Sequence, residues 1–503
     1  MNIAQHVERM ARNSPQHPAI RFEGKSVSYA VLNDCAGALA GALKRKGVRR
    51  GDRVALYLPN IPAFALAYVA ILKAGAIAVS INSIFKAEET KFILNDSGAK
   101  VVFTVAELLS NVPREECRSV EHVVLCEGSN RAAQSLDDWL ALGEGPRVAT
   151  EDMQPDDPAA LLYSSGTTGF PKGVTLTHNN IVSNIRTAAK YSGYLSGDGL
   201  AVFLPLFHVF AQNYIMNAGF EAGATLVLFR RFVPDVVLAA IRNEGITMFF
   251  AVPTIYIALL SAQVPKETLG TIRYFFSAAA TMPEEISRRW TDTYGLRVSE
   301  GYGLTECSPF AAYNHKSKHK FGSVGTAVDD FEIRIVDEND NEVPRGQWGE
   351  IAIRGPGVMK GYWNNAKDTQ WALRGGWLHS GDIGRMDEEN YVYIVDRVKD
   401  MINVSGFKVW PAEVENMLYR HPAVKELAVY GAPDPAKGEK VNVAIVLKEG
   451  ASATAEDIIA YCRDKLAVYK APEKVDFVSE LPKSATGKIL KRILRDQSAK
   501  PGA

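Results

Sequence analysis

Residues 163–174 read YSSGTTGFPKGV and say more about the fold than any other stretch of the chain. Glycines and hydroxyl side chains surround a single lysine, Lys172. Glycine allows a backbone with positive φ, and successive N–H groups that point inward form a nest for anions. The apolar run AALLY before the stretch and VTLT after it predict strands. We therefore expect a loop between two strands that holds a polyphosphate through Ser164, Ser165, Gly166, Thr167, Thr168, Gly169 and Lys172.

The order Pro171-Lys172-Gly173 excludes a Walker A loop, in which glycine precedes the lysine and serine or threonine follows it. Taken alone, the stretch leaves a second interpretation open, a flexible polar hairpin without a ligand.

Length and composition bound the class of protein. A chain of 503 residues exceeds one ordinary hydrophobic core and predicts two or more domains. A hydrophobic content of 47% and a charged content of 23% are typical of soluble globular proteins. Basic and acidic residues balance at 57 each, so no net charge attracts nucleic acid or an anionic membrane. The five cysteines lack a CxxC spacing, which favours reduced thiols in the cytoplasm over disulfides or zinc.

No export signal or integral membrane segment is predicted. Near the start, Ile3, Val7 and Met10 lie on one face of a short helix rather than in a continuous apolar run. The most apolar segment, residues 61–81, is interrupted by Lys73 and Gly75 and falls short of the roughly 20 apolar residues of a membrane span. It predicts a core helix followed by a buried strand.

Helical and strand patterns alternate along the first ~395 residues and predict an α/β fold with parallel sheets covered by helices. Examples are the pairs 63–75 with 76–81, 89–100 with 101–105, and 235–245 with 247–252. Residues 331–355 alternate branched and polar side chains around a DEND turn, which predicts a hairpin with one solvent-exposed face, within a β-rich subdomain.

The last hundred or so residues predict a small, mobile α+β lid. A helix opens at Pro411, strands follow at 423–431 and 440–448, and Thr454 with Asp457 suits a capping box. The expected organisation is a large domain over 1–396, a hinge over 397–401 and the lid over 402–503.

Four further stretches occur in a fixed order after the first. They are LPLFHVFA from Leu204, GYGLTE from Gly301, HSGDIG with DRVKDMINVSGFKV from His379 to Val409, and SATGKILKR from Ser484. In order and spacing the five stretches resemble those of the adenylate-forming enzymes: acyl-CoA synthetases, peptide-synthetase adenylation domains and beetle luciferases. The resemblance covers nearly the whole chain. It implies an enzyme that uses ATP, Mg²⁺, coenzyme A and a small carboxylic acid.

The resemblance assigns nucleotide-binding roles. It implies that Tyr302 stacks on adenine, that Thr305 bonds the α-phosphate and that Glu306 holds Mg²⁺. A hard carboxylate suits a hard cation. Asp382 and Arg397 match contacts to ribose or phosphate, and the small residues Ala278, Ala279 and Ala280 support the adenine where relatives often carry glycine. Without the resemblance, Thr305 and Glu306 suit a helix cap equally well.

The lid is implied to serve two steps. Lys488 matches the catalytic lysine of adenylation, whose ammonium stabilises charge at the α-phosphate and the substrate carboxylate. Lys399 holds the hinge position, Gly406 borders the path of the CoA thiol, and Lys408 lies near the CoA nucleotide. Trp410 either packs the lid or contacts CoA, and the sequence does not decide which.

His208 marks the expected acyl pocket, as a gate between that pocket and the thiol path or as a packed core imidazole. Further expected pocket residues are Val209, Tyr256, Gly301, Gly303 and Ser308, with the two glycines letting an acyl chain pass. No aspartate follows His208 to pair with an amino acid's ammonium, and burying an unpaired charge costs several kcal/mol. The substrate is therefore expected to have an apolar tail.

The predicted function is an ATP-dependent acid–CoA ligase that forms acyl-AMP, then acyl-CoA, with an aliphatic medium- or long-chain acid preferred. Alternatives are an aryl acid–CoA ligase, an acyl-AMP ligase that loads a carrier protein, a luciferase-like oxygenase, or a binding protein without activity. The sequence leaves the oligomeric state open.

Overall fold

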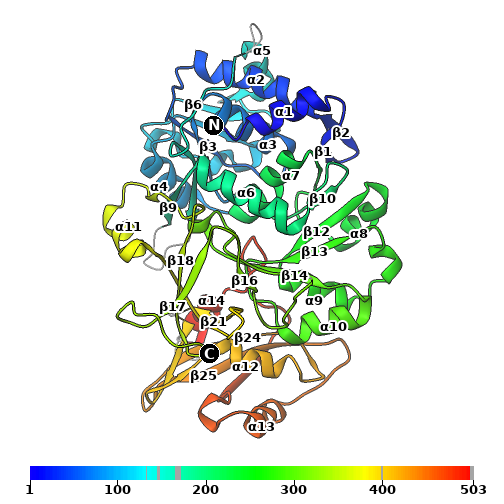
Figure 1. Ribbon diagram of the computed structural model, residues 1–503, viewed down its shortest axis with the longest axis vertical. Helices are drawn as coiled ribbons and strands as arrows, with labels where there is room; N and C mark the ends of the chain where they lie inside the picture. The colour runs from blue at the N-terminus through cyan, green and yellow to red at the C-terminus, as the bar shows by residue number, and fades with distance from the viewer. Residues whose placement is uncertain (132, 144–147, 165–170, 316, 398–399, 499–503) are drawn as a thin grey trace.

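The computed structural model describes residues 1–131, 133–143, 148–164, 171–315, 317–397 and 400–498. Within these ranges the strands form four sheets: three before residue 398, and one after it that lies at the lower end of Figure 1. The predicted α/β class, with helix-covered sheets, a β-rich subdomain and a smaller C-terminal α+β unit, is confirmed.

The first sheet contains the two strands that flank the predicted phosphate loop. Its strand order is β19-β9-β8-β4-β3-β5-β6-β7, parallel from β8 to β7 and antiparallel at β8–β9 and β9–β19. The residues between β8 and β9 are those of the loop, so the predicted pair of strands is confirmed. The strands are β3 (Arg53–Leu56), β4 (Ile77–Ser80), β5 (Val101–Thr104), β6 (His122–Leu125), β7 (Gln134–Ser135), β8 (Pro158–Ser164), β9 (Lys172–Thr177) and β19 (Gly361–Tyr362).

The second sheet has the order β16-β15-β14-β13-β12-β10-β11-β1-β2 and is parallel from β14 to β1. Its strands are β1 (Pro18–Phe22), β2 (Lys25–Ser28), β10 (Gly199–Val202), β11 (Thr225–Leu228), β12 (Ile246–Ala251), β13 (Tyr274–Ser277), β14 (Val298–Tyr302), β15 (Ala312–Asn314) and β16 (Thr326–Ala327). The carboxyl ends of β13 and β14 open toward the lid unit, and parallel strands commonly present their ligand sites at these ends.

Helices cover both sheets. They are α1 (Gln5–Asn13), α2 (Tyr29–Arg45), α3 (Pro62–Lys73), α4 (Ala87–Ser97), α5 (Leu136–Gly143), α6 (His178–Ser192), α7 (Ala218–Ala222), α8 (Pro234–Asn243), α9 (Pro253–Ser261), α10 (Glu284–Tyr294) and α11 (Ala366–Ala372). Residues Phe210–Asn217 form a fully buried π-helical segment, a form that often occurs at functional sites.

The apolar segment 61–81 is a core helix and strand, as predicted. Pro62 lies at the start of α3, where its missing N–H costs nothing. Lys73 is almost fully buried at the end of α3, where it pairs with Glu8. No helix in the described part of the chain is long and apolar enough to cross a membrane.

The third sheet, β17-β18-β20-β21, is antiparallel and confirms the predicted hairpin. Its strands are β17 (Glu332–Val336), β18 (Gly349–Arg354), β20 (Leu378–Met386) and β21 (Val392–Arg397). The C-terminal sheet has the strand order β23-β22-β25-β24, and β26 pairs with β25. This unit contains β22 (Ile402–Val404), β23 (Phe407–Val409), α12 (Pro411–Leu418), β24 (Val424–Asp434), β25 (Gly438–Leu447), α13 (Ala455–Lys465), β26 (Lys474–Phe477) and α14 (Lys491–Ser498). Thr454 and Asp457 form the predicted capping box of α13.

Candidate active site

Three of the predicted nucleotide residues meet across a strand end and a β-hairpin. Tyr302 closes β14, and its hydroxyl donates to the Asp382 carboxylate on β20 over 2.8 Å. Arg397 at the end of β21 is the register partner of Asp382, and its Nε lies 3.4 Å from Asp382 Oδ1. The structure thus brings together an aromatic ring, a mostly buried carboxylate and a half-exposed guanidinium from three motifs.

Glu306 presents a buried carboxylate a few residues further along the chain, in the short 3-10 turn Thr305–Cys307. Its Oε1 accepts hydrogen bonds from the Tyr362 hydroxyl at 3.0 Å and from Ser164 Oγ at 3.4 Å. Burial raises the pKa of Glu306 above its ordinary value, which the two hydroxyl donors only partly offset. Thr305, which opens the same turn, is partly exposed.

The surroundings of Glu306 suit Mg²⁺. Among the described residues, no ion pair includes this carboxylate; it is stabilised by neutral hydroxyl donors and, at longer range, by the charge of Arg397. Mg²⁺ is commonly held by one or two carboxylates together with substrate phosphates. No cluster of three or more His, Cys, Asp or Glu side chains that could hold a metal ion occurs within the described ranges.

The predicted phosphate loop is described only at its two ends. Ser165, Gly166, Thr167, Thr168 and Gly169 lie outside the described residues. Ser164 and Lys172 are register partners across β8 and β9. Lys172 Nζ lies 2.5 Å from Asp368 on α11 and 5.1 Å from the centre of the Tyr362 ring. This ion pair lowers the pKa of Asp368.

Lys488 reaches this site from a turn of the C-terminal unit. Ser484 N–H donates to the Lys488 carbonyl over 2.8 Å, and Lys488 N–H donates to Ser484 Oγ over 3.2 Å, which closes the turn. Thr254 of α9 donates its hydroxyl to the Gly487 carbonyl over 3.2 Å, so the turn rests on the large unit. Burial, and secondly the charge of Arg397, lower the pKa of Lys488 to about 8.

His208 is a neutral imidazole in this environment. Burial, and secondly the charge of Lys488, lower its pKa to about 4. The Phe210 N–H donates to His208 Nδ1 over 3.3 Å, so the ring proton of the neutral form is on Nε2. The charge of Lys488 thus acts on His208 although the two residues are far apart in sequence. His208 can therefore contribute a neutral N–H donor, not a cation.

Aromatic side chains surround the predicted acyl residues. A β-carbon on Gly301 would lie 2.4 Å from the Phe276 ring and 2.8 Å from the Phe310 ring. The Tyr214 ring stacks on Phe276 with centroids 4.7 Å apart and packs against Phe310 at 5.0 Å. Val209 is buried at the start of the π-helical segment that carries Tyr214. Aromatic rings therefore pack directly against Gly301, and the passage for an acyl chain that was expected beside it is not open.

Two further expectations about this pocket need correction. The space beside Gly303 is not open, because a β-carbon there would lie 1.5 Å from the Pro309 carbonyl oxygen; a close backbone contact explains this glycine, not the passage of an acyl chain. Tyr256 is a core residue: it is fully buried against Trp290, and its hydroxyl donates to the Phe276 carbonyl over 2.9 Å. Ser308 is also buried, with its hydroxyl donating to Gly357 over 2.8 Å.

The three alanines follow directly after β13, half-buried at its carboxyl end. Ala279 has a φ of 69°, a left-handed backbone conformation that glycine adopts more readily than alanine. This conformation gives a physical reason why glycine is frequent at such a position.

The predicted CoA residues lie on the exposed β22–β23 hairpin. Gly406 is exposed with a φ of 89° at the hairpin turn, and a β-carbon there would meet open space. Lys408 is exposed and lies 4.0 Å from Glu338. Trp410 is partly buried at the N-cap of α12, which favours lid packing. Lys399 lies outside the described residues.

Sequence patterns did not single out several residues at the site. Tyr362, Asp368 and Thr254 contact Glu306, Lys172 and the Lys488 turn from distant segments. Glu300 on β14 is fully buried, with His319 Nε2 at 3.7 Å, and burial raises the pKa of Glu300. Glu300 precedes Tyr302 by two residues in the same strand, and alternate residues of a strand share a face. This spacing was the sequence signal that could have found Glu300.

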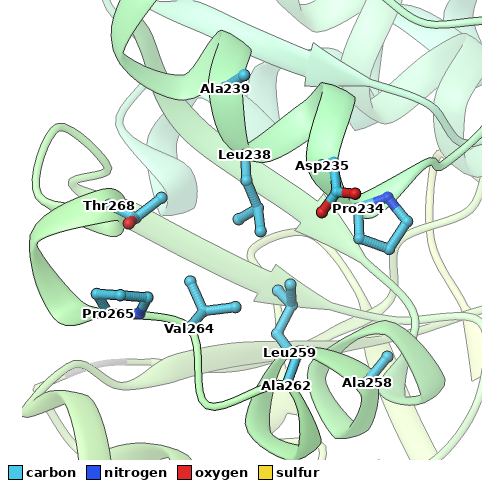
Figure 2. Close-up of a pocket in the computed structure, with 10 residues that line it drawn as sticks. All are labelled: Pro234, Asp235, Leu238, Ala239, Ala258, Leu259, Ala262, Val264, Pro265 and Thr268. Atoms are coloured by element: carbon cyan, nitrogen blue, oxygen red, sulfur yellow. The ribbon is translucent and has the colours of Figure 1, made fainter.

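A separate cavity of about 420 Å³ lies between α8 and α9, away from these motifs (Figure 2). Its lining is mainly apolar and includes none of the predicted site residues. The lining residues are Pro234, Asp235, Leu238, Ala239, Ala258, Leu259, Ala262, Val264, Pro265 and Thr268.

Comparisons with known proteins agree with this arrangement. Residues 7–363 match the model of the AMP-binding enzyme family, and residues 413–488 match that of the AMP-binding enzyme C-terminal domain. A long-chain-fatty-acid–CoA ligase of Bacillus subtilis is 34% identical over 97% of this chain and 93% of its own length. A feruloyl-CoA synthase of Amycolatopsis is 36% identical over 97% of both chains.

Among solved structures, the anthranilate CoA ligase AuaEII in complex with anthranoyl-AMP superposes with a TM-score of 0.91. It has 30% sequence identity and covers 99% of this chain and 97% of its own. The first matched region includes the stretches that start at Tyr163, Leu204 and Gly301, and the second ends at Lys488; the stretch 379–409 lies between the two. The chain therefore belongs to the adenylate-forming AMP-binding enzymes, in their acyl-CoA synthetase branch, and is an AMP-forming acid–CoA ligase that uses ATP and coenzyme A.

Proposed function

We propose that Lys488, Asp382, Arg397 and Glu306 carry the adenylation step. A carboxylate oxygen of the acid attacks the α-phosphorus of ATP, the bond to the β-phosphate oxygen breaks, and pyrophosphate leaves. Asp382 accepts ribose hydroxyls, and Lys488 stabilises the negative charge that redistributes between the carboxylate and the α-phosphate. Mg²⁺ held at Glu306 would offset phosphate charge. The observation that carries this proposal is the Lys488 turn, which docks on Thr254 of the large unit and places a partly buried lysine within the electrostatic influence of Arg397 and Asp382.

Smaller roles complete this step. Tyr302 offers its ring to adenine, and Thr305 donates to the α-phosphate. Lys172 and the loop residues 164–169 hold the β- and γ-phosphates, which form the leaving group. Lys172 pairs with Asp368, so it must exchange one anionic partner for another when ATP binds. His208, which is neutral and feels the charge of Lys488, can donate from Nε2 toward the acid or the thioester carbonyl.

The second step needs a different lid position. Gly406 and Lys408 lie on an exposed hairpin while Lys488 occupies the site, so one position cannot present both sets of residues. We propose that the lid, residues 402–503, rotates about a hinge at 397–401 that includes Lys399. The CoA thiol then attacks the acyl carbonyl of acyl-AMP with loss of its proton, and the C–O bond to AMP breaks. Rotations of this kind gate many two-step enzymes.

We propose an aliphatic medium- or long-chain acid as the substrate. Val209, Phe210 and Ala211 after His208 are buried and apolar, and the Bacillus relative is named for long-chain fatty acids. A second candidate is an aryl acid. The rings of Tyr214, Phe276 and Phe310 beside Gly301 favour it, because aromatic rings stack well on one another, and the Amycolatopsis relative is named for feruloyl-CoA. The five free thiols fit a cytoplasmic location.

A panel of acids tests this substrate class. We expect kcat/KM for pyrophosphate release to be highest with an aliphatic acid, and at least about 100-fold lower with α-amino acids of equal size, because a buried ammonium would lack a partner. Each acid is measured with and without CoA, so that a ligase that loads a carrier protein would show acyl-AMP but no acyl-CoA. An aryl acid that exceeds every aliphatic acid would establish the second candidate and contradict the first.

The pKa of Lys488 predicts an alkaline limit for adenylation. Burial disfavours the charged ammonium, so Lys488 loses its proton at about pH 8, well below an ordinary lysine. We expect the rate of acyl-AMP formation to fall as pH rises through that value. The control is Lys488→Arg, which stays protonated and should lose this fall whatever its overall rate. Rates of pyrophosphate release between about pH 6 and pH 10 measure both enzymes. If the arginine variant shows the same fall in rate at high pH, the fall belongs to a group other than Lys488.

A further inference from the structure

One lysine of the C-terminal unit, Lys491, lies between two carboxylates from different parts of the chain. Its Nζ is 3.1 Å from Asp396 Oδ2 and 3.0 Å from Glu415 Oε1. All three side chains are largely buried: 18% of Lys491, 11% of Asp396 and 18% of Glu415 remain exposed. Burial lowers the pKa of Lys491, but the two carboxylates more than offset this and hold it above its ordinary value. Lys491 is therefore a cation with two partners.

The two carboxylates belong to different units. Asp396 pairs with Ile383 in the β20–β21 hairpin of the large unit. Glu415 is on α12 of the C-terminal unit and also accepts the Val429 N–H of β24 over 2.9 Å. Lys491 opens α14, which packs on the same unit through Leu494, beside Ala428. Figure 1 shows α14 next to β21. A lid rotation would leave Lys491 with Glu415 and separate it from Asp396.

Contacts of this kind between the two units are few. Among the described residues, the ion pairs between 1–396 and 402–498 are Lys491–Asp396 and Lys408–Glu338. The second is long, at 4.0 Å, and exposed, and such surface pairs contribute little. The first is short and buried, and removing one member of a buried pair is costly. Lys491 also follows Lys488 by three residues, so a contact that fixes Lys491 also fixes the catalytic turn.

We propose that Lys491 and Asp396 form a latch that holds the lid in the adenylation position, with Lys491 acting as a positioning residue for Lys488. The proposal rests on the two lid positions of the proposed function. Closing the latch favours acyl-AMP formation. Opening it leaves the Lys491 ammonium paired with Glu415, so the lid can rotate without exposing an unpaired buried charge.

The two carboxylates offer matched variants. Asp396→Asn removes the partner on the large unit, and Glu415→Gln removes the partner within the lid. Two half-reactions are measured with the best acid of the panel: acyl-AMP formation without CoA, and AMP release from supplied acyl-AMP with CoA. Because Asp396 also raises the pKa of Lys488, plateau rates from full pH profiles are compared. We expect Asp396→Asn to lower the first rate at least about tenfold and the second less than about threefold. Glu415→Gln should lower both by a similar factor, through lid stability.

The length of the contact gives a further check. Asp396→Glu keeps the charge and should retain most of the adenylation rate. Asp396→Ser, which also removes the charge, replaces Asp396→Asn in the comparison should that variant fail to fold. The latch would be overturned if the uncharged Asp396 variant lost equal activity in both half-reactions. It would also be overturned if the ratio of the two half-reaction rates were the same in the Asp396 and Glu415 variants. A wild-type enzyme that forms no acyl-AMP with any acid would instead overturn the proposed function, and the latch with it.

Discussion

Replacing Lys488 by alanine is expected to reduce acyl-AMP formation by roughly 10²–10³-fold or more, the loss typical when a charge-stabilising group is removed from a transition state. The side chain is partly buried and feels the charges of Arg397 and Asp382, and water would be a weaker substitute for its ammonium. Conversion of supplied acyl-AMP and CoA to acyl-CoA should change little, because in the proposed second position Lys488 has left the site.

The measurement separates the half-reactions: release of pyrophosphate without CoA, and release of AMP from synthetic acyl-AMP with CoA. Arg492→Ala is the matched control, because Arg492 is an exposed cation four residues away in the same segment. It should leave both rates unchanged. If Lys488→Ala slows both half-reactions equally, a single lid position serves both steps and the two-position account is wrong.

The Gly406→Leu variant is expected to show the opposite pattern. Gly406 lies at an exposed hairpin turn with open space around it, so a leucine disturbs no contact in the adenylation position. In the second position its side chain would block the path of the thiol. We expect thioester formation from supplied acyl-AMP to fall by roughly 100-fold or more, as when reacting atoms are kept from contact, while acyl-AMP formation is retained.

The φ of 89° at Gly406 makes any L-residue strained, so a second variant is needed. Gly406→Ala carries the same backbone strain with a much smaller side chain. The two variants should therefore differ in the thioester step and agree in acyl-AMP formation. A leucine variant with a normal thioester rate would mean that the thiol reaches the site by another path.

Much of the fold could be predicted from local patterns, and the reasons are physical. The segment 61–81 carries its own helix start at Pro62 and a break at Gly75, and the hairpin around residues 163–174 carries its glycines and flanking strands. Residues joined by one motif, such as Thr305 and Glu306, need no tertiary information. The family and the type of reaction followed from five such motifs.

The missed features depend on contacts between distant segments. Tyr362 is 56 residues from Glu306 in the chain, and Thr254 is 233 residues from Gly487, so no spacing could reveal either hydrogen bond. The prediction that Gly303 lets an acyl chain pass was wrong for a related reason. A glycine that is required because a carbonyl group lies close to it looks the same in sequence as a glycine that opens a pocket. Likewise, Lys491 has the sequence signature of an exposed basic helix end, and only its neighbours Asp396 and Glu415 show that it is buried.

The central claim is that one lysine on a movable lid serves acyl-AMP formation before CoA enters. A rapid-quench experiment with ATP labelled at the α-phosphate and the best acid tests it most directly. The account predicts that labelled acyl-AMP accumulates in the absence of CoA and is converted to AMP and acyl-CoA when CoA is added, and that the Lys488→Ala variant accumulates none. Labelled ADP as the product, or acyl-AMP at the wild-type rate in the variant, would contradict it.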